Sequence, residues 1–228
     1  MGDAPEEIDA ARADVDLLRR RVLNVVGHEL RTPITTLRGL AELLGTTPDE
    51  PEKTAAVRDA IQRSARRIEH LVDDALVALG VTTAMPVGSV HPTAVAAVVT
   101  EAWETVGQGD LVVEGNATAL VHPDGFRRAL ACVLDNANKY GERVHVQVAE
   151  QNGHAIVTVL DEGPGLTAGE DALLFEPFFR GERAVMTAPG LGLGLAVARR
   201  LLEHDGGTVE VGAADGGGAA ATVRVPRP

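Results

Sequence analysis

The first residues that could do chemistry are His28 and Glu29, which stand side by side in a segment with helical periodicity. A neutral imidazole nitrogen is a good nucleophile near neutral pH, and a neighbouring carboxylate can take or orient the proton on the other ring nitrogen. Pro33 deletes a backbone N–H that would bond the carbonyl of Glu29, so we expect a kink there. For this motif alone, a surface histidine with no chemical role is the competing interpretation.

A second group of residues is suited to a nucleotide's phosphates. Asn136 carries one carbonyl oxygen for a hard cation, and Lys139, one helical turn later, can reach a phosphate. Gly190, Gly192 and Gly194 alternate with leucines before an expected helix, where exposed N–H groups and the helix N-terminus form a cradle for anions. The spacing matches neither a Walker loop nor the dinucleotide fingerprint. Alone, the Asn-x-x-Lys pattern is equally compatible with an ordinary helix end.

Two further motifs lie between these phosphate-binding candidates. Asp161 ends an apolar strand and is followed by Gly163 and Gly165, so its carboxylate could accept from an exocyclic amine while the glycines let a flat ring approach the backbone. The segment Phe175-Glu176-Pro177-Phe178-Phe179-Arg180 holds three of the chain's four phenylalanines. It could anchor a loop or close a lid over a nucleotide.

The first of these motifs must be positioned by two long helices. Apolar residues seven apart form a coiled-coil seam from Ile8 to Val25, and the apolar face shifts after residue 28. A turn at 45–50 ends this helix, and a second helix is expected over 51–79. The apolar stripes are too long for one hairpin to bury, which predicts a dimeric four-helix bundle; a solvated tether on a coiled-coil dimer is the alternative.

The remaining motifs fall in a part of the chain that alternates helix and strand. We predict a dimerisation hairpin over 1–80, a linker over 81–91 and a second domain over 92–228. The elements expected in the second domain are helices at 93–106, 124–140 and 192–204 and strands at 111–114, 119–121, 143–150, 154–160, 208–213 and 220–226. Such a pattern predicts an α+β protein whose second domain is an α/β sandwich, with helices on one face of a mixed sheet.

Composition narrows the classes of function. The chain has 228 residues and a net charge of −12, which argues against binding to nucleic acid or to anionic membranes. One cysteine, Cys132, excludes a disulfide framework and suits a reducing compartment. No apolar run reaches the roughly 20 residues of a membrane helix, and the acidic start is not a signal peptide. We therefore expect a cytoplasmic chain, either self-standing or the cytoplasmic part of a membrane receptor.

Taken in chain order, the five motifs resemble the H, N, G1, F and G2 boxes of the sensor histidine kinases of two-component systems. The resemblance extends from about residue 8 to residue 226. It implies a dimerisation and phosphotransfer hairpin followed by an ATPase domain of the GHKL type. The activity implied is an ATP-dependent protein histidine kinase that phosphorylates its own histidine and passes the group to an aspartate of a response regulator.

The resemblance also implies a role for each matched residue. His28 would be the phosphoacceptor with Glu29 as its general base, and Thr32 would position water if the chain also dephosphorylates its partner. The implied nucleotide contacts are Asn136 on Mg²⁺; Lys139, Arg180, Gly190, Gly192 and Gly194 on the phosphates; Tyr140, Asp161, Gly163 and Gly165 at the adenine; and Phe175 and Phe178 as anchors of the lid. ATP, Mg²⁺, a second copy of the chain and a response regulator are the implied ligands and partners.

One position departs from the family pattern. Cys132 stands four residues before Asn136, where the family commonly has a second asparagine, and a thiol is a poor ligand for Mg²⁺. Two alternatives follow. A GHKL ATPase could act as a conformational machine, although such relatives lack a histidine hairpin, or the chain could be a phosphotransfer scaffold with an inactive ATPase domain.

Overall fold

The computed structural model describes residues 27, 30–45, 51–81, 85–107, 109–141, 143–167, 169–181, 190–215 and 217–228. The chain divides into two compact units, Met1–Asp73 and Asp74–Pro228. His28, Glu29, the predicted kink at Glu29 and the predicted coiled-coil seam lie outside the described residues. None of the helices in the described ranges is long and apolar enough to cross a bilayer.

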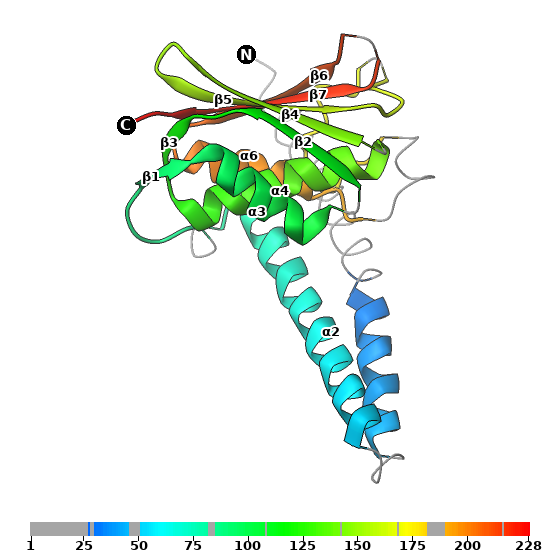
Figure 1. The fold of residues 1–228 in the computed structure, drawn as a ribbon. Coiled ribbons are helices and arrows are strands. Elements are labelled where there is room, and N and C mark those ends of the chain that lie inside the picture. Colours follow the sequence, from blue (N-terminus) through cyan, green and yellow to red (C-terminus); the bar gives the residue numbers. More distant parts are fainter. Residues whose placement is uncertain are drawn as a thin grey trace, which may run out of the picture. The chain divides into compact units, whose positions relative to one another are not determined.

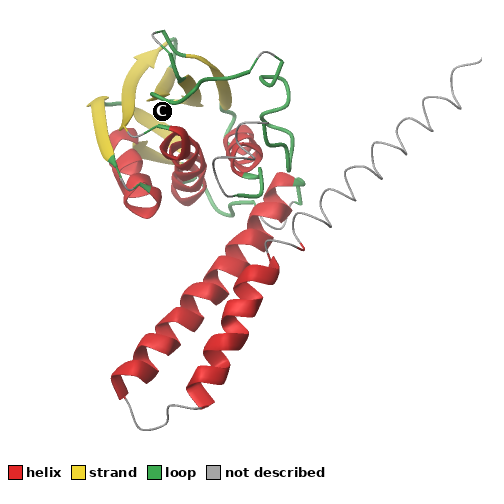
Figure 2. Cartoon of the chain, turned by 90° about the vertical axis from the view of Figure 1, so that its right-hand side faces the viewer, coloured by secondary structure: helices red, strands yellow, loops and turns green. Residues whose placement is uncertain are grey.

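The first unit contains a helix over residues 30–45 and most of α2 (Pro51–Ala78), which lie side by side as a hairpin (Figures 1 and 2). Partly buried positions on α2, such as Val57, Ile61 and Ile68, recur at helical spacing and form its inner face. Three large apolar side chains stay well exposed on this single hairpin: Ile34, Leu43 and Val72. The predicted pair of helices is therefore confirmed, with apolar surface left over.

The second unit is built on a mixed sheet of five strands in the order β2-β4-β5-β7-β6. The strands are β2 (Asp110–Gly115), β4 (Arg143–Gln151), β5 (His154–Asp161), β6 (Thr208–Ala213) and β7 (Ala219–Pro226). β2 runs parallel to β4, and the other neighbours are antiparallel. β5 alternates buried and partly exposed residues, as a strand with one covered face must.

Three helices cover one face of this sheet: α3 (Val95–Val106), α4 (Pro123–Tyr140) and α6 (Gly194–His204) (Figure 1). α4 begins at Pro123, whose fixed φ suits the first helical turn, and presents a buried face that includes Phe126, Leu130 and Leu134. These side chains form the core together with strand residues such as Val146 and Val157. The predicted α+β class, with helices on one face of a mixed sheet, is confirmed.

A small second sheet was not predicted. β1 (His91–Ala94) pairs antiparallel with β3 (Thr118–Val121), and the Val95 N–H donates to the carbonyl of Ala117. The sequence places His91 in the linker and starts a helix at 93, whereas the helix starts at Val95. β1 has only four residues, one of them proline, and its pairing with β3 is a tertiary contact that a local pattern does not show.

Candidate functional site

The C-terminal end of α4 carries the first part of the candidate site. Asn136 is partly buried and Lys139 exposed, and the Lys139 ammonium nitrogen lies 2.5 Å from a carboxylate oxygen of Asp135 one turn earlier. A Cβ built on Gly190 would lie 3.6 Å from the same Lys139 nitrogen. The predicted Asn-x-x-Lys motif and the start of the predicted glycine-rich loop therefore meet in space, although 50 residues separate them along the chain.

α6 begins where this loop ends, and its first residue packs against α4. A Cβ on Gly194 would lie 3.8 Å from the Cβ and the carbonyl oxygen of Cys132. Burial raises the pKa of the Cys132 thiol to about 12, and the nearby Asp74 carboxylate adds to the shift. Cys132 is therefore a neutral thiol at the junction of α4 and α6. A thiol in this state offers a hard cation no charge.

The carboxylate of Asp161 is fixed at the end of β5. It is only 7% exposed, and its Oδ1 accepts the N–H of Gly163 at 2.9 Å and the N–H of Ala219 at 3.1 Å. A Cβ on Gly218 would lie within 2 Å of the Asp161 carbonyl oxygen, so this approach requires glycine. Two backbone donors on one oxygen hold the carboxylate in a single orientation, which suits a rigid acceptor of one hydrogen bond.

Tyr140 joins the Asp161 region to α4. A Cβ on Gly163 would lie 2.7 Å from the Tyr140 carbonyl oxygen and 2.8 Å from Asp161 Oδ1, which leaves no room for a side chain at residue 163. Burial raises the pKa of the Tyr140 phenol, while the charges of Lys139 and Arg180 act in the opposite direction. The Tyr140 carbonyl oxygen and Cβ thus lie at the same glycine as the Asp161 carboxylate, and the Tyr140 phenol is close enough to Lys139 and Arg180 to feel their charges.

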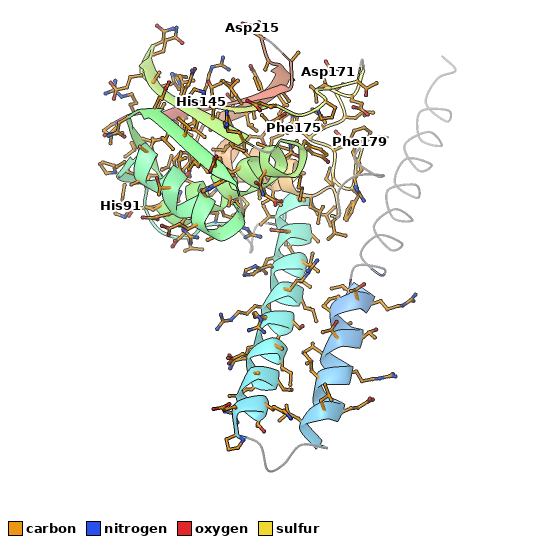
Figure 3. All side chains as sticks on the ribbon, turned by 45° about the vertical axis from the view of Figure 1, so that its right-hand side comes forward. His91, His145, Asp171, Phe175, Phe179 and Asp215 are labelled. Atoms are coloured by element: carbon orange, nitrogen blue, oxygen red, sulfur yellow. The ribbon has the colours of Figure 1, made fainter. Side chains whose placement is uncertain are left out.

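The phenylalanine-rich segment is tied to the glycine-rich loop by a backbone hydrogen bond. The Phe178 N–H donates to the Gly192 carbonyl at 2.9 Å, and both residues have positive φ, 66° and 70°. A Cβ on Gly192 would lie 2.3 Å from the carbonyl oxygen of Phe179, so only glycine fits there. The guanidinium of Arg199 on α6 stacks over the Phe175 ring at 5.5 Å. Figure 3 marks Phe175 and Phe179 in this segment.

The structure therefore brings four of the five predicted motifs together within the second unit. They surround the junction between the end of α4, the end of β5 and the start of α6. Thr32 belongs to the first unit, where it is exposed and its carbonyl accepts the Thr36 hydroxyl at 3.1 Å. Residues 182–189, between the phenylalanine-rich segment and the glycine-rich loop, lie outside the described residues.

Sequence reasoning missed two participants in this cluster. Asp135 stands four residues before Lys139, and the i, i+4 spacing of opposite charges could have identified it as the partner of that lysine. Ala219 contributes only a backbone N–H to Asp161, from a position 58 residues further along the chain. No side-chain pattern carries such a contact.

Comparison with known families matches both halves of the chain. Residues 18–77 match the model of the His Kinase A (phospho-acceptor) domain. Residues 121–228 match the model of the histidine kinase-, DNA gyrase B- and HSP90-like ATPases. The order of the two domains is the order that the motifs predicted.

Individual histidine kinases are similar to this chain in sequence and in structure. Over 96% of this chain, it is 30% identical to the sensor protein KdpD of Mycobacterium tuberculosis, of which it covers 27%. It is 36% identical, over 84% of its length, to the signal transduction histidine-protein kinase/phosphatase MprB of Mycobacterium sp. strain KMS, and covers 39% of that protein. A solved structure of the mycobacterial sensor histidine kinase MprB superposes with a TM-score of 0.53 and 31% identity, over 61% of this chain and 99% of that one.

The fold and the clustered motifs thus define a two-domain core made of a phosphoacceptor hairpin and an ATPase domain. This chain belongs to the sensor histidine kinases of two-component systems. It spans about a quarter to two fifths of the length of the curated relatives given above.

Proposed function

We propose that this chain is the cytoplasmic catalytic core of a histidine kinase that phosphorylates itself on His28 with ATP. The observation that carries the proposal is the meeting of Lys139, Gly190, Asp161 and Tyr140 at one junction of the ATPase domain, in a chain that also matches the phosphoacceptor domain. One carboxylate that can accept a hydrogen bond from the base and one ammonium group that can bind a phosphate suit a nucleoside triphosphate.

The residues of this cluster divide between the two ends of ATP. The fixed Asp161 carboxylate accepts a hydrogen bond from the exocyclic amine of adenine, and the Tyr140 ring lies against the base, with Gly163 and Gly165 shaping the pocket. Lys139 and Arg180 neutralise the phosphates. Backbone N–H groups of Gly190, Gly192 and Gly194 at the start of α6 bind phosphate oxygens, helped by the partial positive charge of the helix N-terminus. Phe175 and Phe178 anchor the segment that closes over the nucleotide.

The donor set fits Mg²⁺ when the ion is held largely by the substrate. Mg²⁺ usually takes one or two protein oxygens and completes its shell with phosphates and water. The Asn136 side-chain oxygen supplies one such ligand, and the Cys132 thiol supplies none because burial keeps it protonated. When bound, Mg²⁺ neutralises charge that develops on the transferred phosphoryl group.

The transfer itself needs one nucleophile and one base. A ring nitrogen of His28 attacks the γ-phosphorus, the new N–P bond forms as the bond to the bridging oxygen breaks, and ADP leaves with the electron pair. Glu29 accepts the proton from the other ring nitrogen. The resulting phosphohistidine donates its phosphoryl group to an aspartate carboxylate of a response regulator. Thr32 positions a water that hydrolyses the aspartyl phosphate to aspartate and inorganic phosphate, a phosphatase activity that the name of the relative MprB includes.

A second copy of the chain completes the hairpin. Ile34, Leu43 and Val72 remain 52%, 51% and 43% exposed on a single hairpin. Pairing with an identical hairpin buries such residues in a four-helix bundle, which explains their apolar character without any other partner.

Incubation with ATP labelled on the γ-phosphate tests the activity. We expect label on the protein that resists alkali and is lost in acid, is absent in His28→Gln and is retained in His70→Gln, a substitution of an exposed histidine on α2. Release of inorganic phosphate without labelled protein would favour an ATPase machine. Failure to bind a nucleotide analogue at millimolar Mg²⁺ would favour the scaffold with an inactive ATPase domain.

A further inference from the structure

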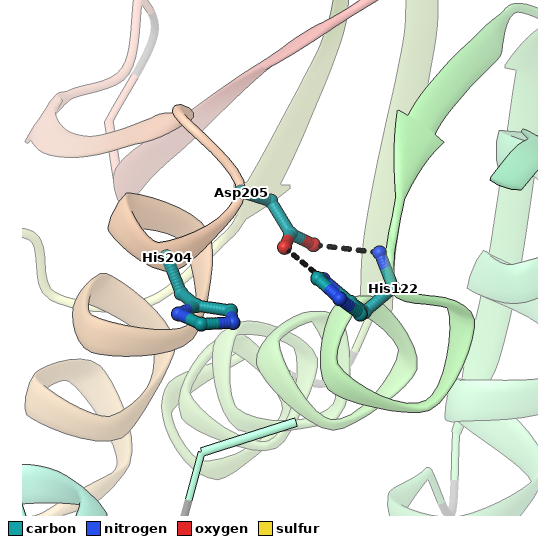
Figure 4. Close-up of side chains that lie close together, drawn as sticks. All are labelled: His122, His204 and Asp205. Carbon is teal, nitrogen blue, oxygen red and sulfur yellow. Dashed lines mark hydrogen bonds and ion pairs between the residues drawn. The ribbon is translucent and has the colours of Figure 1, made fainter. Parts of the chain in front are cut away.

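A second cluster of reactive side chains lies at the other ends of α4 and α6. His122 is the residue before the first turn of α4, and His204 and Asp205 end α6 (Figure 4). Each offers one ligand atom, and these three atoms lie within 4.8 Å of one another. Because α4 has 18 residues, the cluster lies about 25 Å from Tyr140 at the far end of that helix.

Asp205 is the fixed member of the cluster. Its side chain is 3% exposed, and its Oδ2 accepts the backbone N–H of His122 at 2.8 Å. Its Oδ1 lies 2.5 Å from His122 Nδ1. Both helix ends are therefore joined through one carboxylate, which is held in place by a backbone donor and keeps lone pairs directed toward the imidazole.

His122 has the surroundings of a metal-ligating imidazole. Its Nδ1 faces Asp205, while its Nε2 lies 3.3 Å from the carbonyl oxygen of Gly88. Metal-bound histidines usually donate their second N–H to a backbone carbonyl or carboxylate, which fixes the ring and leaves the other nitrogen for the ion. The Gly88 carbonyl occupies this position, so an ion would bind at Nδ1 and displace the proton that Nδ1 shares with Asp205.

His204 supplies the third donor from the solvent side. Its ring centroid lies 5.1 Å from that of His122, with the planes tilted by 38°, and the residue is exposed. Ligand atoms of a tetrahedral zinc ion lie about 3.3 Å apart, so binding requires the exposed His204 ring to move inward. It also requires the 2.5 Å hydrogen bond between His122 Nδ1 and Asp205 Oδ1 to open by about 1 Å, as the ion replaces the shared proton. Small side-chain rotations of the two histidines can provide these movements without a change in the backbone of α6.

We propose that His122, His204 and Asp205 form a binding site for a divalent transition-metal ion, with Zn²⁺ as the best match. Two imidazole nitrogens and one carboxylate oxygen are borderline donors that zinc accepts, and solvent can complete a tetrahedral shell. Ca²⁺ and Mg²⁺ prefer six or more oxygen ligands and are a poor match. A bound ion would tie the start of α4 to the end of α6 and so stabilise the domain.

Zinc binding by the untagged full chain tests this site. We expect calorimetric titration with ZnCl₂ at pH 8 to show one site of micromolar affinity or better, and Co²⁺ to give the intense visible absorption of a four-coordinate ion. Asp205 raises the pKa of His122, so an alkaline buffer limits competition by protons. His204→Ala should weaken Zn²⁺ binding by on the order of 100-fold, because it removes a ligand and leaves the buried pair intact.

Two controls separate the site from the fold and from other histidines. His70→Ala, on the exposed surface of α2, should leave the tight site unchanged, and His204→Ala should bind a nucleotide analogue as the parent chain does. Equal Zn²⁺ affinity of His204→Ala and parent, or no binding by the parent at tens of micromolar Zn²⁺, would overturn the proposal. Because zinc affinity is read without phosphorylation, the result does not depend on the kinase activity.

Discussion

The ammonium nitrogen of Lys139 lies 2.5 Å from a carboxylate oxygen of Asp135, and Gly190 at the start of the glycine-rich loop lies against the same lysine. The lysine is thus held beside the loop by a carboxylate on its own helix. A triphosphate that binds there must compete with Asp135 for the lysine, and the two negative groups repel each other.

The relationship between these two residues predicts opposite effects of two substitutions. Lys139→Ala should weaken ATP binding by on the order of 10- to 100-fold, because it removes a charge-assisted contact to phosphate. Asp135→Asn should strengthen ATP binding several-fold, because it releases the lysine and removes a nearby negative charge. Displacement of a fluorescent nucleotide analogue measures both affinities. Weaker binding by Asp135→Asn would show instead that Asp135 is needed to position the lysine.

Asp161→Asn should affect affinity more than stability. Its Oδ1 accepts two backbone N–H groups, which an amide oxygen can still do, so we expect the free energy of unfolding to fall by about 1 kcal/mol or less. The loss of the carboxylate should lower ATP affinity at least tenfold. Urea unfolding and nucleotide titration on the same sample separate the two effects. Unchanged ATP affinity in a folded variant would contradict the adenine-side role of Asp161.

Gly192→Ala should disrupt the link between the phenylalanine-rich segment and the glycine-rich loop. The residue has a φ of 70°, and a Cβ there would lie 2.3 Å from the Phe179 carbonyl oxygen. We expect a strong loss of nucleotide binding, with a cost of about 1–3 kcal/mol from backbone strain alone. Gly212→Ala on β6 is the matched control, because nothing lies within 4 Å of its added Cβ. Equal nucleotide affinity of Gly192→Ala and Gly212→Ala would contradict a role of the glycine-rich loop in nucleotide binding.

The raised pKa of Cys132 predicts an unreactive thiol. Near pH 8.5 an ordinary thiol is about half ionised, whereas a thiol with a pKa of about 12 is ionised roughly a thousandfold less. The rate of alkylation by iodoacetamide should therefore be about a thousandfold lower in the native chain than in urea. The native rate should rise tenfold per pH unit between pH 8 and 10, since the thiolate fraction does. Similar rates in native and unfolded chains would contradict a partly buried, neutral thiol.

Most of the fold could be predicted because its elements carry local signals. Three such elements have the type that was predicted. β5 shows alternating apolar and polar residues, α4 has an amphipathic pattern, and glycines precede α6. α6 begins at Gly194 and not at 192, because Gly192 adopts a positive φ to accept the Phe178 N–H through its carbonyl. Helix propensities along the sequence do not predict a turn that depends on a hydrogen bond to a distant residue.

The parts that could not be predicted depend on contacts between distant residues. The hydrogen bonds between His122 and Asp205 join positions 83 residues apart, and the only local sign of them is a polar residue at each helix end. The Ala219 N–H that orients Asp161 comes from the next strand of the sheet, β7. Such pairs follow from the strand order and helix packing, which local periodicity does not specify.

The phosphorus NMR spectrum of the chain after incubation with ATP and Mg²⁺ tests the central claim most directly, because a phosphorus bonded to imidazole nitrogen resonates apart from phosphate esters and free phosphate. A phosphoramidate signal in the parent chain and in His70→Gln, and none in His28→Gln, is the predicted result. A phosphoramidate signal that persists in His28→Gln, or ATP turnover by the parent without any such signal, would contradict phosphorylation of His28.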